Sequence, residues 1–264
     1  MAREGFVTPF LTAVGTMCYR QVKRFLRMRS RVVMSFLRPM MWLLFFGLGW
    51  SAALRGRPGQ EILGGISYLE FLAPGVAMMA VFFSSFFAGT SVIWDREFGF
   101  LKELLVAPAS RRAIILGRAL GDALLALLQG VITFAIASAL AGRLNIPGLP
   151  VLLLAMFLTA ITYACLGSAV GSVVGSVESF QLINMSLALP MFFLSGTVVP
   201  LHTAPGWMKM ASLVVPLTYG VDAARSASCG LGLMPMWLDL AVLSCLALLS
   251  VLLAAKAFER ATLA

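Results

Sequence analysis

The sequence predicts an all-α polytopic membrane protein: six transmembrane helices, an N-terminal amphipathic interface helix, and short re-entrant outer helices before the last span. Hydrophobic residues make up 60% of the 264 residues, charged residues make up 12%, and the mean hydropathy is +0.95. A soluble domain has nearer half apolar and ~25% charged residues, so this composition excludes that class. A helical span needs ~20 mainly apolar residues. The runs of that length are Val32 to Ala53, Phe71 to Ile93, Ala119 to Ala141, Val151 to Val174, Leu182 to Val199 and Met236 to Ala255.

We expect one transmembrane domain over residues 1–264. Within it, residues 6–31 form the interface helix and residues 32–255 form the six-span bundle. The bundle includes an inner loop at 94–118 and an outer re-entrant segment at 200–230.

Lys and Arg are distributed unevenly over the predicted loops. With the N-terminus inside, fifteen of the twenty lie on the cytoplasmic side, as the positive-inside rule requires. We therefore predict a multi-pass protein of the plasma (inner) membrane with both termini cytoplasmic. The net charge of +9 is a topology signal and an attraction to anionic membrane lipids; we expect no nucleic acid partner.

The N-terminal helix is amphipathic. Its apolar face carries Phe10, Val14, Met17, Cys18, Val22 and Phe25. The opposite face carries Arg20, Lys23, Arg24 and Arg27. A basic face against an apolar stripe is typical of a helix lying at the membrane surface. A plain membrane anchor and a clasp for a cytoplasmic partner both remain open. Arg38, at the start of the first span, can extend to the lipid headgroups.

The segment Trp94 to Arg118 is a charged island between two long apolar runs. We expect it to lie in water, because its charges could not stay unpaired in hydrocarbon. Phe98, Leu101 and Leu105 have the spacing of a short amphipathic helix, and Pro108 ends it. Ser110 is then placed to cap a helix that begins at Arg111. The island's charged residues are Asp95, Arg96, Glu97, Lys102, Glu103, Arg111, Arg112 and Arg118.

The third and fourth spans carry polar and small residues. Asp122 stands four residues after Arg118, and we expect the two to pair in preference to a transport role for Asp122. Gly167, Gly171 and Gly175 recur every four residues, which lets two helix backbones approach closely. Whether the second helix belongs to this chain or to a second copy stays open. Glu178 follows in a short inner loop and is a second candidate contact for a cytoplasmic partner.

The connection Ser195 to Gly230 is too long for a turn and too rich in proline for a span. Trp207, Met208, Ala211, Val214 and Val215 recur at helical spacing, which predicts short amphipathic helices that dip into the outer leaflet. Asp222 and Arg225 can satisfy each other at i, i+3. His202 and the four cysteines form no close-spaced ligand set, so we predict neither a metal site nor a disulfide framework.

Sequence signatures of several enzyme classes are absent. No GxxxxGK[ST], HExxH or GxSxG motif occurs, so nucleotide hydrolysis by a phosphate loop, metalloprotease chemistry and serine hydrolysis lack their residues. The ionisable groups crowd toward the span ends, whereas a secondary transporter is expected to carry coupling groups near the midplane. The energy for any work must therefore come from elsewhere, and we predict no enzymatic activity and no cofactor in this chain.

Three stretches carry a resemblance to a known family. They are FLAPG at Phe71 to Gly75, PLTYGVDAAR at Pro216 to Arg225, and an inner loop with Glu97, Gly99, Leu104, Pro108, Arg111, Gly117 and Arg118. Together with the span number, they resemble the permease subunits of ABC-2 type ATP-binding-cassette exporters, in the branch of daunorubicin-resistance and nodulation-factor export permeases. The inner loop is the most specific stretch. One departure is Phe100, where many relatives carry a small polar residue.

The resemblance implies an exporter subunit that moves a lipophilic or amphipathic substrate, such as a drug, lipid or glycolipid-like molecule. Two permease copies, as a homodimer, would pair in the lipid membrane above separate ATPase subunits that bind ATP and Mg. Residues implied in coupling to the ATPase are Glu97, Gly99, Leu101, Leu104, Leu105, Pro108, Arg111 and Arg118, beside the interface-helix cations Arg20, Lys23, Arg24 and Arg27. Those implied in an outer gate are Pro216, Tyr219, Asp222 and Arg225. The alternatives are a stand-alone channel or proton-coupled secondary transporter and, third, an intramembrane enzyme.

Overall fold

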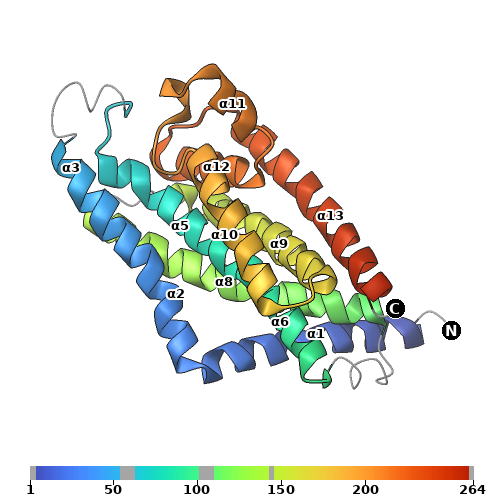
Figure 1. Ribbon diagram of the computed structural model, residues 1–264. Coiled ribbons are helices and arrows are strands. Elements are labelled where there is room, and N and C mark those ends of the chain that lie inside the picture. Colours follow the sequence, from blue (N-terminus) through green and yellow to red (C-terminus); the bar gives the residue numbers. More distant parts are fainter. Residues whose placement is uncertain (1–3, 54–62, 101–109, 143–145, 262–264) are drawn as a thin grey trace.

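In a computed structural model, the chain is described over residues 4–53, 63–100, 110–142 and 146–261, and all regular elements in these ranges are helical. Figure 1 shows a bundle of long helices with both chain termini at one end. We call this the inner end, because it is the end predicted to be cytoplasmic, and the opposite one the outer end. Six helical stretches are long and apolar enough to cross a membrane: Val32–Ser51, Tyr68–Glu97, Arg111–Ala141, Leu149–Val173, Val177–Leu194 and Met236–Arg260. This confirms the predicted fold class and span number.

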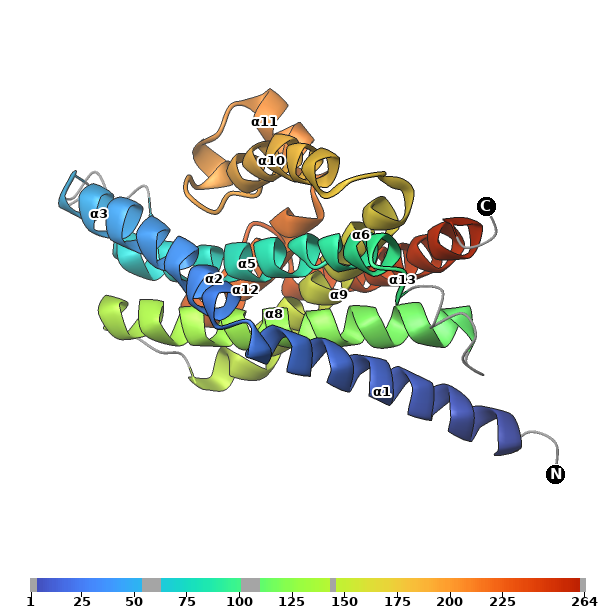
Figure 2. The same ribbon diagram turned by 60° about the horizontal axis from the view of Figure 1, so that its bottom comes forward.

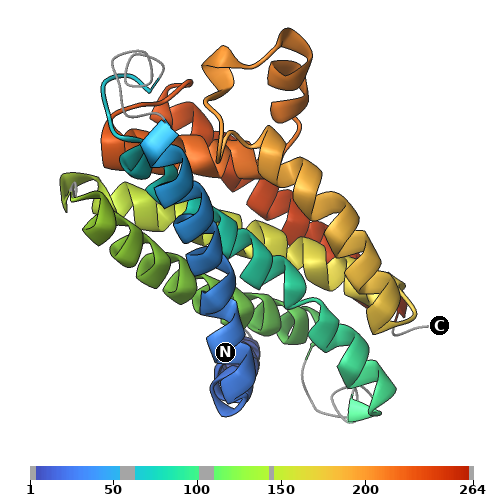
Figure 3. The ribbon, with the colours of Figure 1, turned by 60° about the vertical axis from the view of Figure 1, so that its left-hand side comes forward.

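The N-terminal region forms an elbow. Helix α1 (Glu4–Arg27) ends at Met28, whose backbone leaves the helical region, and α2 (Arg29–Trp42) starts in a new direction. The first span continues through a π-helical stretch (Leu43–Leu48) into α3 (Gly49–Ala53). Figures 1 and 3 show α1 at a steep angle to α2. The predicted interface helix of residues 6–31 is therefore interrupted four residues before its expected end.

The second span runs further toward the inner end than predicted. Helix α5 (Tyr68–Phe87) begins with a capping box in which Ser67 and Glu70 satisfy each other's backbone N–H groups, the arrangement that fixes a helix start. After a short break at residues 88–89, α6 (Thr90–Glu97) continues. The charged island expected in water from Trp94 onward thus begins as helix, and Asp95 is buried within it.

The third and fourth spans match their predicted runs closely. Helix α8 (Arg111–Ala141) is capped by the hydroxyl of Ser110, which accepts from the Ala113 backbone N–H at 3.2 Å, as predicted. A 3-10 turn (Ile146–Gly148) leads into α9 (Leu149–Val173). In Figure 2, α1 lies alongside the inner half of α8, where Gly117 and Gly121 allow the backbones to approach. The apolar stripe of α1 therefore packs on protein at Met17 and Phe25, both buried.

Gly167 and Gly171 of α9, which we call the glycine seam, pack against another segment of this same chain. A Cβ on Gly167 would lie 2.3 Å from the carbonyl oxygen of Phe86, and one on Gly171 would lie 2.4 Å from that of Gly89. No side chain fits in such a gap, so α9 meets the α5–α6 break backbone to backbone. Gly175 has open space around its Cβ position and lies beyond the end of α9, so it contributes nothing to the seam.

The fifth span is displaced from its predicted place. Helix α10 (Val177–Leu194) starts five residues before the expected Leu182, because the Ser176 hydroxyl caps it by accepting from the Ser179 N–H at 3.2 Å. Glu178, expected in a loop, therefore lies in the first helical turn, where it is exposed.

Short helices follow at the outer end, as predicted. They are a 3-10 turn (Leu201–Thr203), α11 (Gly206–Ser212) and α12 (Pro216–Cys229), after which α13 (Met236–Ala261) forms the last span. Val214 and Val215 were expected in the same amphipathic segment as Trp207, but α11 ends at Ser212, before both residues. Figure 1 shows α11 at the outer tip and α12 beside the outer parts of α5, α9 and α13.

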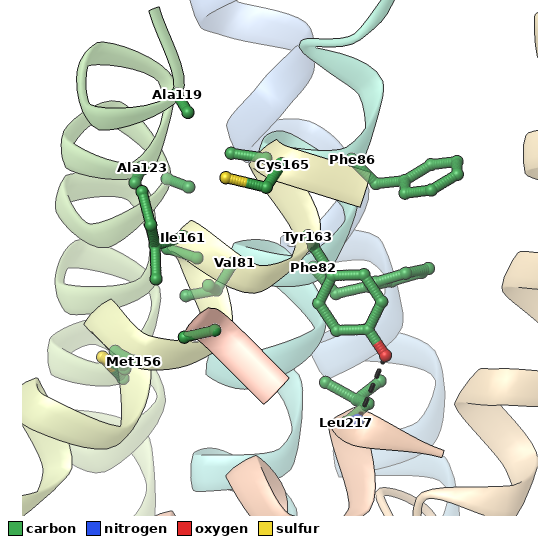
Figure 4. Packing of buried hydrophobic residues seen from close by; sticks show 14 of the residues in the cluster. Val81, Phe82, Phe86, Ala119, Ala123, Met156, Ile161, Tyr163, Cys165 and Leu217 are labelled. Atoms are coloured by element: carbon green, nitrogen blue, oxygen red, sulfur yellow. Dashed lines mark hydrogen bonds between the residues drawn. The ribbon is translucent and has the colours of Figure 1, made fainter. Parts of the chain in front are cut away.

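The core joins α12 to the spans. Figure 4 shows Phe82 and Phe86 next to Tyr163, with the Phe82 and Tyr163 rings 4.6 Å apart edge to face. The Leu217 backbone N–H, at the start of α12, donates to the Tyr163 hydroxyl at 3.1 Å. Tyr163 thus satisfies a backbone donor that α12 cannot satisfy itself, and anchors the start of α12 to the middle of α9.

Candidate functional site

The most concentrated charge in the described chain is a buried ionic cluster at the inner end. Asp95 of α6 is 3% exposed. Its carboxylate accepts from the guanidiniums of Arg20 and Arg24 on α1, at 3.1 Å each, and from that of Arg118 on α8. We call these four residues the Asp95 cluster. One carboxylate therefore holds three helices together through charge-assisted hydrogen bonds, which are the stronger kind.

Arg118 is the innermost member of the Asp95 cluster. Its side chain is fully buried, and it also donates to the backbone oxygen of Ser91 at 3.2 Å. The predicted pair of Arg118 and Asp122 is not formed as a direct contact: Asp122 accepts from the Gln21 amide through both oxygens, at 3.1 Å, and attracts Arg118 only as a nearby charge. Arg118 reaches across to α6 because Asp95 lies there between α1 and α8, whereas Asp122 faces Gln21 of α1.

Arg96 connects α6 to a fourth helix. Its guanidinium donates to the backbone oxygen of Ser172 at 3.4 Å and to that of Val174. The Ser172 carbonyl lies in the last turn of α9, which has no helical partner for it and carries the negative end of the helix dipole. Val174 is the residue directly after that helix. Two consecutive side chains, Asp95 and Arg96, therefore fix the end of α6 to α1, α8 and α9.

Aromatic contacts extend this joint toward the inner loop. The Arg20 guanidinium lies 4.0 Å from the ring centroid of Phe100, and that of Arg24 lies 5.5 Å from that of Trp94. Both are cation–π distances. Phe100 thus gives the start of the inner loop a direct contact with α1.

The residues predicted to contact an ATPase fall into three groups. Glu97 is exposed at the end of α6, Gly99 follows with a φ of +73°, and Arg111 is partly exposed at the start of α8. Arg118 is buried in the Asp95 cluster. Leu101, Leu104, Leu105 and Pro108 lie outside the described residues, and so does most of the amphipathic helix predicted there.

The basic face of α1 is divided. Lys23 and Arg27 are exposed, as expected for a surface-facing side. Arg20 and Arg24 turn inward instead, and their side chains are only 25% and 27% exposed. The expectation of one uniform basic surface is therefore wrong for these two residues, because a buried carboxylate on α6 attracts them.

The predicted outer-gate residues all lie on α12, but they do not pair as expected. Pro216 begins the helix, and Tyr219 donates its hydroxyl to the Leu213 backbone oxygen at 2.7 Å. Asp222 and Arg225 form no mutual ion pair in the described chain, because each is satisfied by backbone groups of neighbouring loops. Asp222 accepts from the N–H groups of Leu233 and Met234, at 2.9 Å each.

Arg225 joins α12 to the loop after α10 and to α5. It donates to the Gly196 backbone oxygen at 3.0 Å and lies 3.8 Å from the ring centroid of Phe71. Burial lowers the pKa of the Arg225 guanidinium to about 10, against the attraction of the nearby Asp222 carboxylate. The PLTYGVDAAR stretch is thus a structural clasp around the outer ends of the spans.

Reasoning from sequence missed three features of these sites. Asp95 was expected in water, and Gln21 was given no role. Arg20, Gln21 and Arg24 lie within five consecutive residues of α1, and this polar group was the available signal. Asp239, in the first turn of α13, is fully buried next to the carboxylate of Asp222. No sequence pattern separated Asp239 from an ordinary residue at a span end. Among the described residues no group of three His, Cys, Asp or Glu could hold a metal ion.

The fold and the Asp95 cluster define a multi-pass helical membrane protein whose inner helix ends are joined by buried charge. The chain belongs to the ABC-2 type transporter family, because the family's sequence model matches residues 12–228. Permeases of this family work, in general, with an ATPase subunit.

Similar proteins carry names of the same kind. The transport permease ycf38 of Porphyra purpurea is 30% identical over 75% of this chain and 68% of its own. The inner membrane transport permease YadH of Escherichia coli strain K12 is 23% identical over 86% of this chain and 87% of its own. The daunorubicin resistance ABC transporter permease protein DrrB1 of Streptomyces coeruleorubidus is 24% identical over 81% of this chain and 74% of its own.

Proposed function

We propose that this chain is the membrane-spanning permease subunit of an ATP-binding-cassette exporter. A separate ATPase subunit, which binds ATP and Mg, drives it, and two permease copies pair in the plasma membrane with their termini in the cytoplasm. The substrate is lipophilic or amphipathic and moves outward. The name of the daunorubicin-resistance relative supports a drug-like cargo, and the family supports the ATPase partner.

The observation that carries this proposal is the joint at the end of α6. The inner loop leaves α6 after Glu97 and re-enters the bundle at Arg111. Its two flanks are held by the Asp95 cluster on α1 and α8 and by Arg96 on α9. A displacement of the loop by a partner below the membrane is therefore passed to four helices at once and is not absorbed locally.

The joint suits a two-state switch. An ATPase can change the conformation of the permease only by binding its two states with different affinity. Glu97, Phe98 and Arg112 are exposed beside the loop and offer both charge and apolar surface for such a contact. Packed helices that move as rigid bodies then carry a small displacement at the inner end to the outer end.

The experiment is reconstitution of the permease with its ATPase in vesicles. Removing either flanking charge, Glu97→Ala or Arg111→Ala, is expected to reduce stimulated ATPase activity and transport while membrane insertion remains normal. Lys209→Ala is the matched control, because Lys209 is an exposed cation on α11 at the outer end; its activity should stay at the wild-type level.

Two results would contradict the proposal. Wild-type ATPase stimulation in both flank variants would remove the coupling role from these residues. Transport by the permease alone, with no ATPase present and unchanged by ATP, would instead identify a stand-alone channel or a proton-coupled carrier.

A further inference from the structure

We infer that the cavity behind the α1–α2 elbow binds the phosphate-bearing headgroup of one anionic lipid. The cavity has a volume of about 240 Å³ and lies between α1, α2, α5 and α8. The inference concerns the permease itself, so it holds whether or not an ATPase is bound. It goes beyond the proposed function because it assigns a ligand site within one subunit.

The first argument is an uncompensated cation. Arg38 of α2 lines the cavity and stands within the first span. Its guanidinium lies 4.9 Å from the ring centroid of Phe83, yet no ion pair of Arg38 is found among the described residues. A cation inside a span is costly unless it finds an anion or reaches the headgroups. A lipid phosphate drawn into the cavity supplies that anion.

The second argument is a buried donor with nothing to donate to. Gln129 lines the same cavity from α8 and is 2% exposed, and its Nε2 has no hydrogen-bond partner in the described part of the chain. Native structures rarely leave such a group unsatisfied, because an unpaired buried donor keeps the full cost of its lost hydration. A phosphate or ester oxygen would accept from it.

The charges around the cavity favour an anion that also carries a hydroxyl. Arg24 and Arg38 line it with a single carboxylate, Asp122, which already accepts from the Gln21 amide. Arg24 is itself paired with Asp95, so Arg38 is the lining cation for which no ion pair is found in the described residues. The other end of that amide, Gln21 Oε1, is buried and has no partner in the described ranges. It could accept from a headgroup hydroxyl, such as the glycerol group of phosphatidylglycerol.

The cavity wall also has an apolar side that inorganic phosphate would not use. Phe25, Met34, Phe83, Phe87 and Leu125 line it. Met34 is 64% exposed on α2, as is expected where a cavity opens toward lipid. At about 240 Å³ the cavity is smaller than typical small-molecule sites of ~300–1,000 Å³, so it fits a headgroup whose acyl chains remain in the surrounding bilayer.

The test measures lipid retention by the purified, full-length permease with native mass spectrometry. The delipidated protein is exposed to equimolar phosphatidylglycerol and phosphatidylcholine, with and without excess inorganic phosphate. We expect one phosphatidylglycerol to be retained selectively per chain. Arg38→Gln should reduce that selectivity by about tenfold, the equivalent of one charge-assisted hydrogen bond, and Gln129→Leu should reduce it without any change in charge.

Matched controls separate this site from general lipid binding and from misfolding. Arg260→Gln and Gln181→Leu make the same chemical changes at exposed positions outside the cavity and should keep the wild-type selectivity. Equal retention of the two lipids, or the same loss in Arg260→Gln as in Arg38→Gln, would overturn the proposal. Displacement of the lipid by inorganic phosphate alone would identify a free anion as the ligand and would also overturn it. Gln129→Leu keeps the test valid if Arg38→Gln fails to fold.

Discussion

The inner and outer ends of the molecule use buried charge in opposite ways. At the inner end, the Asp95 carboxylate is shared by three guanidiniums from two other helices. At the outer end, Asp222 and Arg225 sit one turn apart on α12 but bind backbone groups of nearby loops. The inner charges therefore join three helices to one another, whereas Asp222 closes a local connection and Arg225 binds the Gly196 loop and the Phe71 ring of α5.

This difference assigns different mechanical roles to the two ends. Side chains that join separate helices transmit a displacement of one helix to the others. Side chains that satisfy loop backbone, as Asp222 does, fix the shape of one connection. We therefore expect changes at the inner end to disturb the whole bundle, and changes at the outer end to remain local.

The largest effect is expected from Asp95→Asn. This change leaves three guanidiniums, including the fully buried Arg118, without their anion. Breaking a buried ion pair from one side costs about 3–5 kcal/mol. Denaturant unfolding of the purified permease should show a loss of that size. Glu97→Gln, two residues on and exposed, should stay within about 0.5 kcal/mol of wild type; equal losses in both variants would contradict a special role for Asp95.

A smaller loss is expected from Gly89→Ala, which tests whether the inner joint depends on the glycine seam. A Cβ on Gly89 would lie 2.1 Å from the backbone oxygen of Gly167, so α6 and α9 must separate. Overpacking of this kind costs about 1–3 kcal/mol, measurable in the same unfolding experiment. Gly175→Ala has open space and should be nearly neutral. A neutral Gly89→Ala would show that the helices do not meet this closely.

At the outer end, Asp222→Asn should cost about 1–2 kcal/mol, since the amide oxygen can still accept one of the two backbone hydrogen bonds to Leu233 and Met234. The loss should appear as faster hydrogen exchange confined to residues near 222–236. Exchange that also rises in α1 or α6 would contradict the local role assigned to the outer charges.

The smallest effect is expected from Arg112→Ala. Arg112 pairs with Glu259 of α13 at 3.1 Å, but the Arg112 side chain is 71% exposed, and exposed pairs contribute about 0–1 kcal/mol. Unfolding free energy measured at low and high salt should differ little from wild type. A loss as large as that of Asp95→Asn would mean that solvent exposure does not separate the two kinds of inner ion pair.

The spans were predictable from sequence because length and apolar composition alone decide what crosses a membrane. The start of α8 was also predictable, since Ser110 and Arg111 form a local capping signal. The start of α10 was placed too late, at Leu182, because only the apolar run was considered. Ser176 is a local capping signal, like Ser110, and it marks the true start.

The ionic joint was not predictable, because the partners of Asp95 lie 23 to 75 positions away in the sequence. Asp95 was read as solvated since it follows the apolar run of its span, and nothing local indicates that α1 folds back over it. The expected i, i+3 and i, i+4 pairs of Asp222 and Asp122 failed for the same reason. Spacing on one helix indicates which groups can meet, and tertiary packing decides which of them do.

A double-mutant cycle between Asp95 and Arg24 tests the joint most directly. Unfolding free energies of Asp95→Asn, Arg24→Gln and the double variant give the interaction energy of the pair, isolated from effects of each change alone. If α1 is held to α6 by this contact, the second change should cost clearly less in the double variant, by about 1–3 kcal/mol. Strictly additive losses would mean that Arg24 and Asp95 do not interact, and would contradict one of the two ion pairs that join α1 to α6.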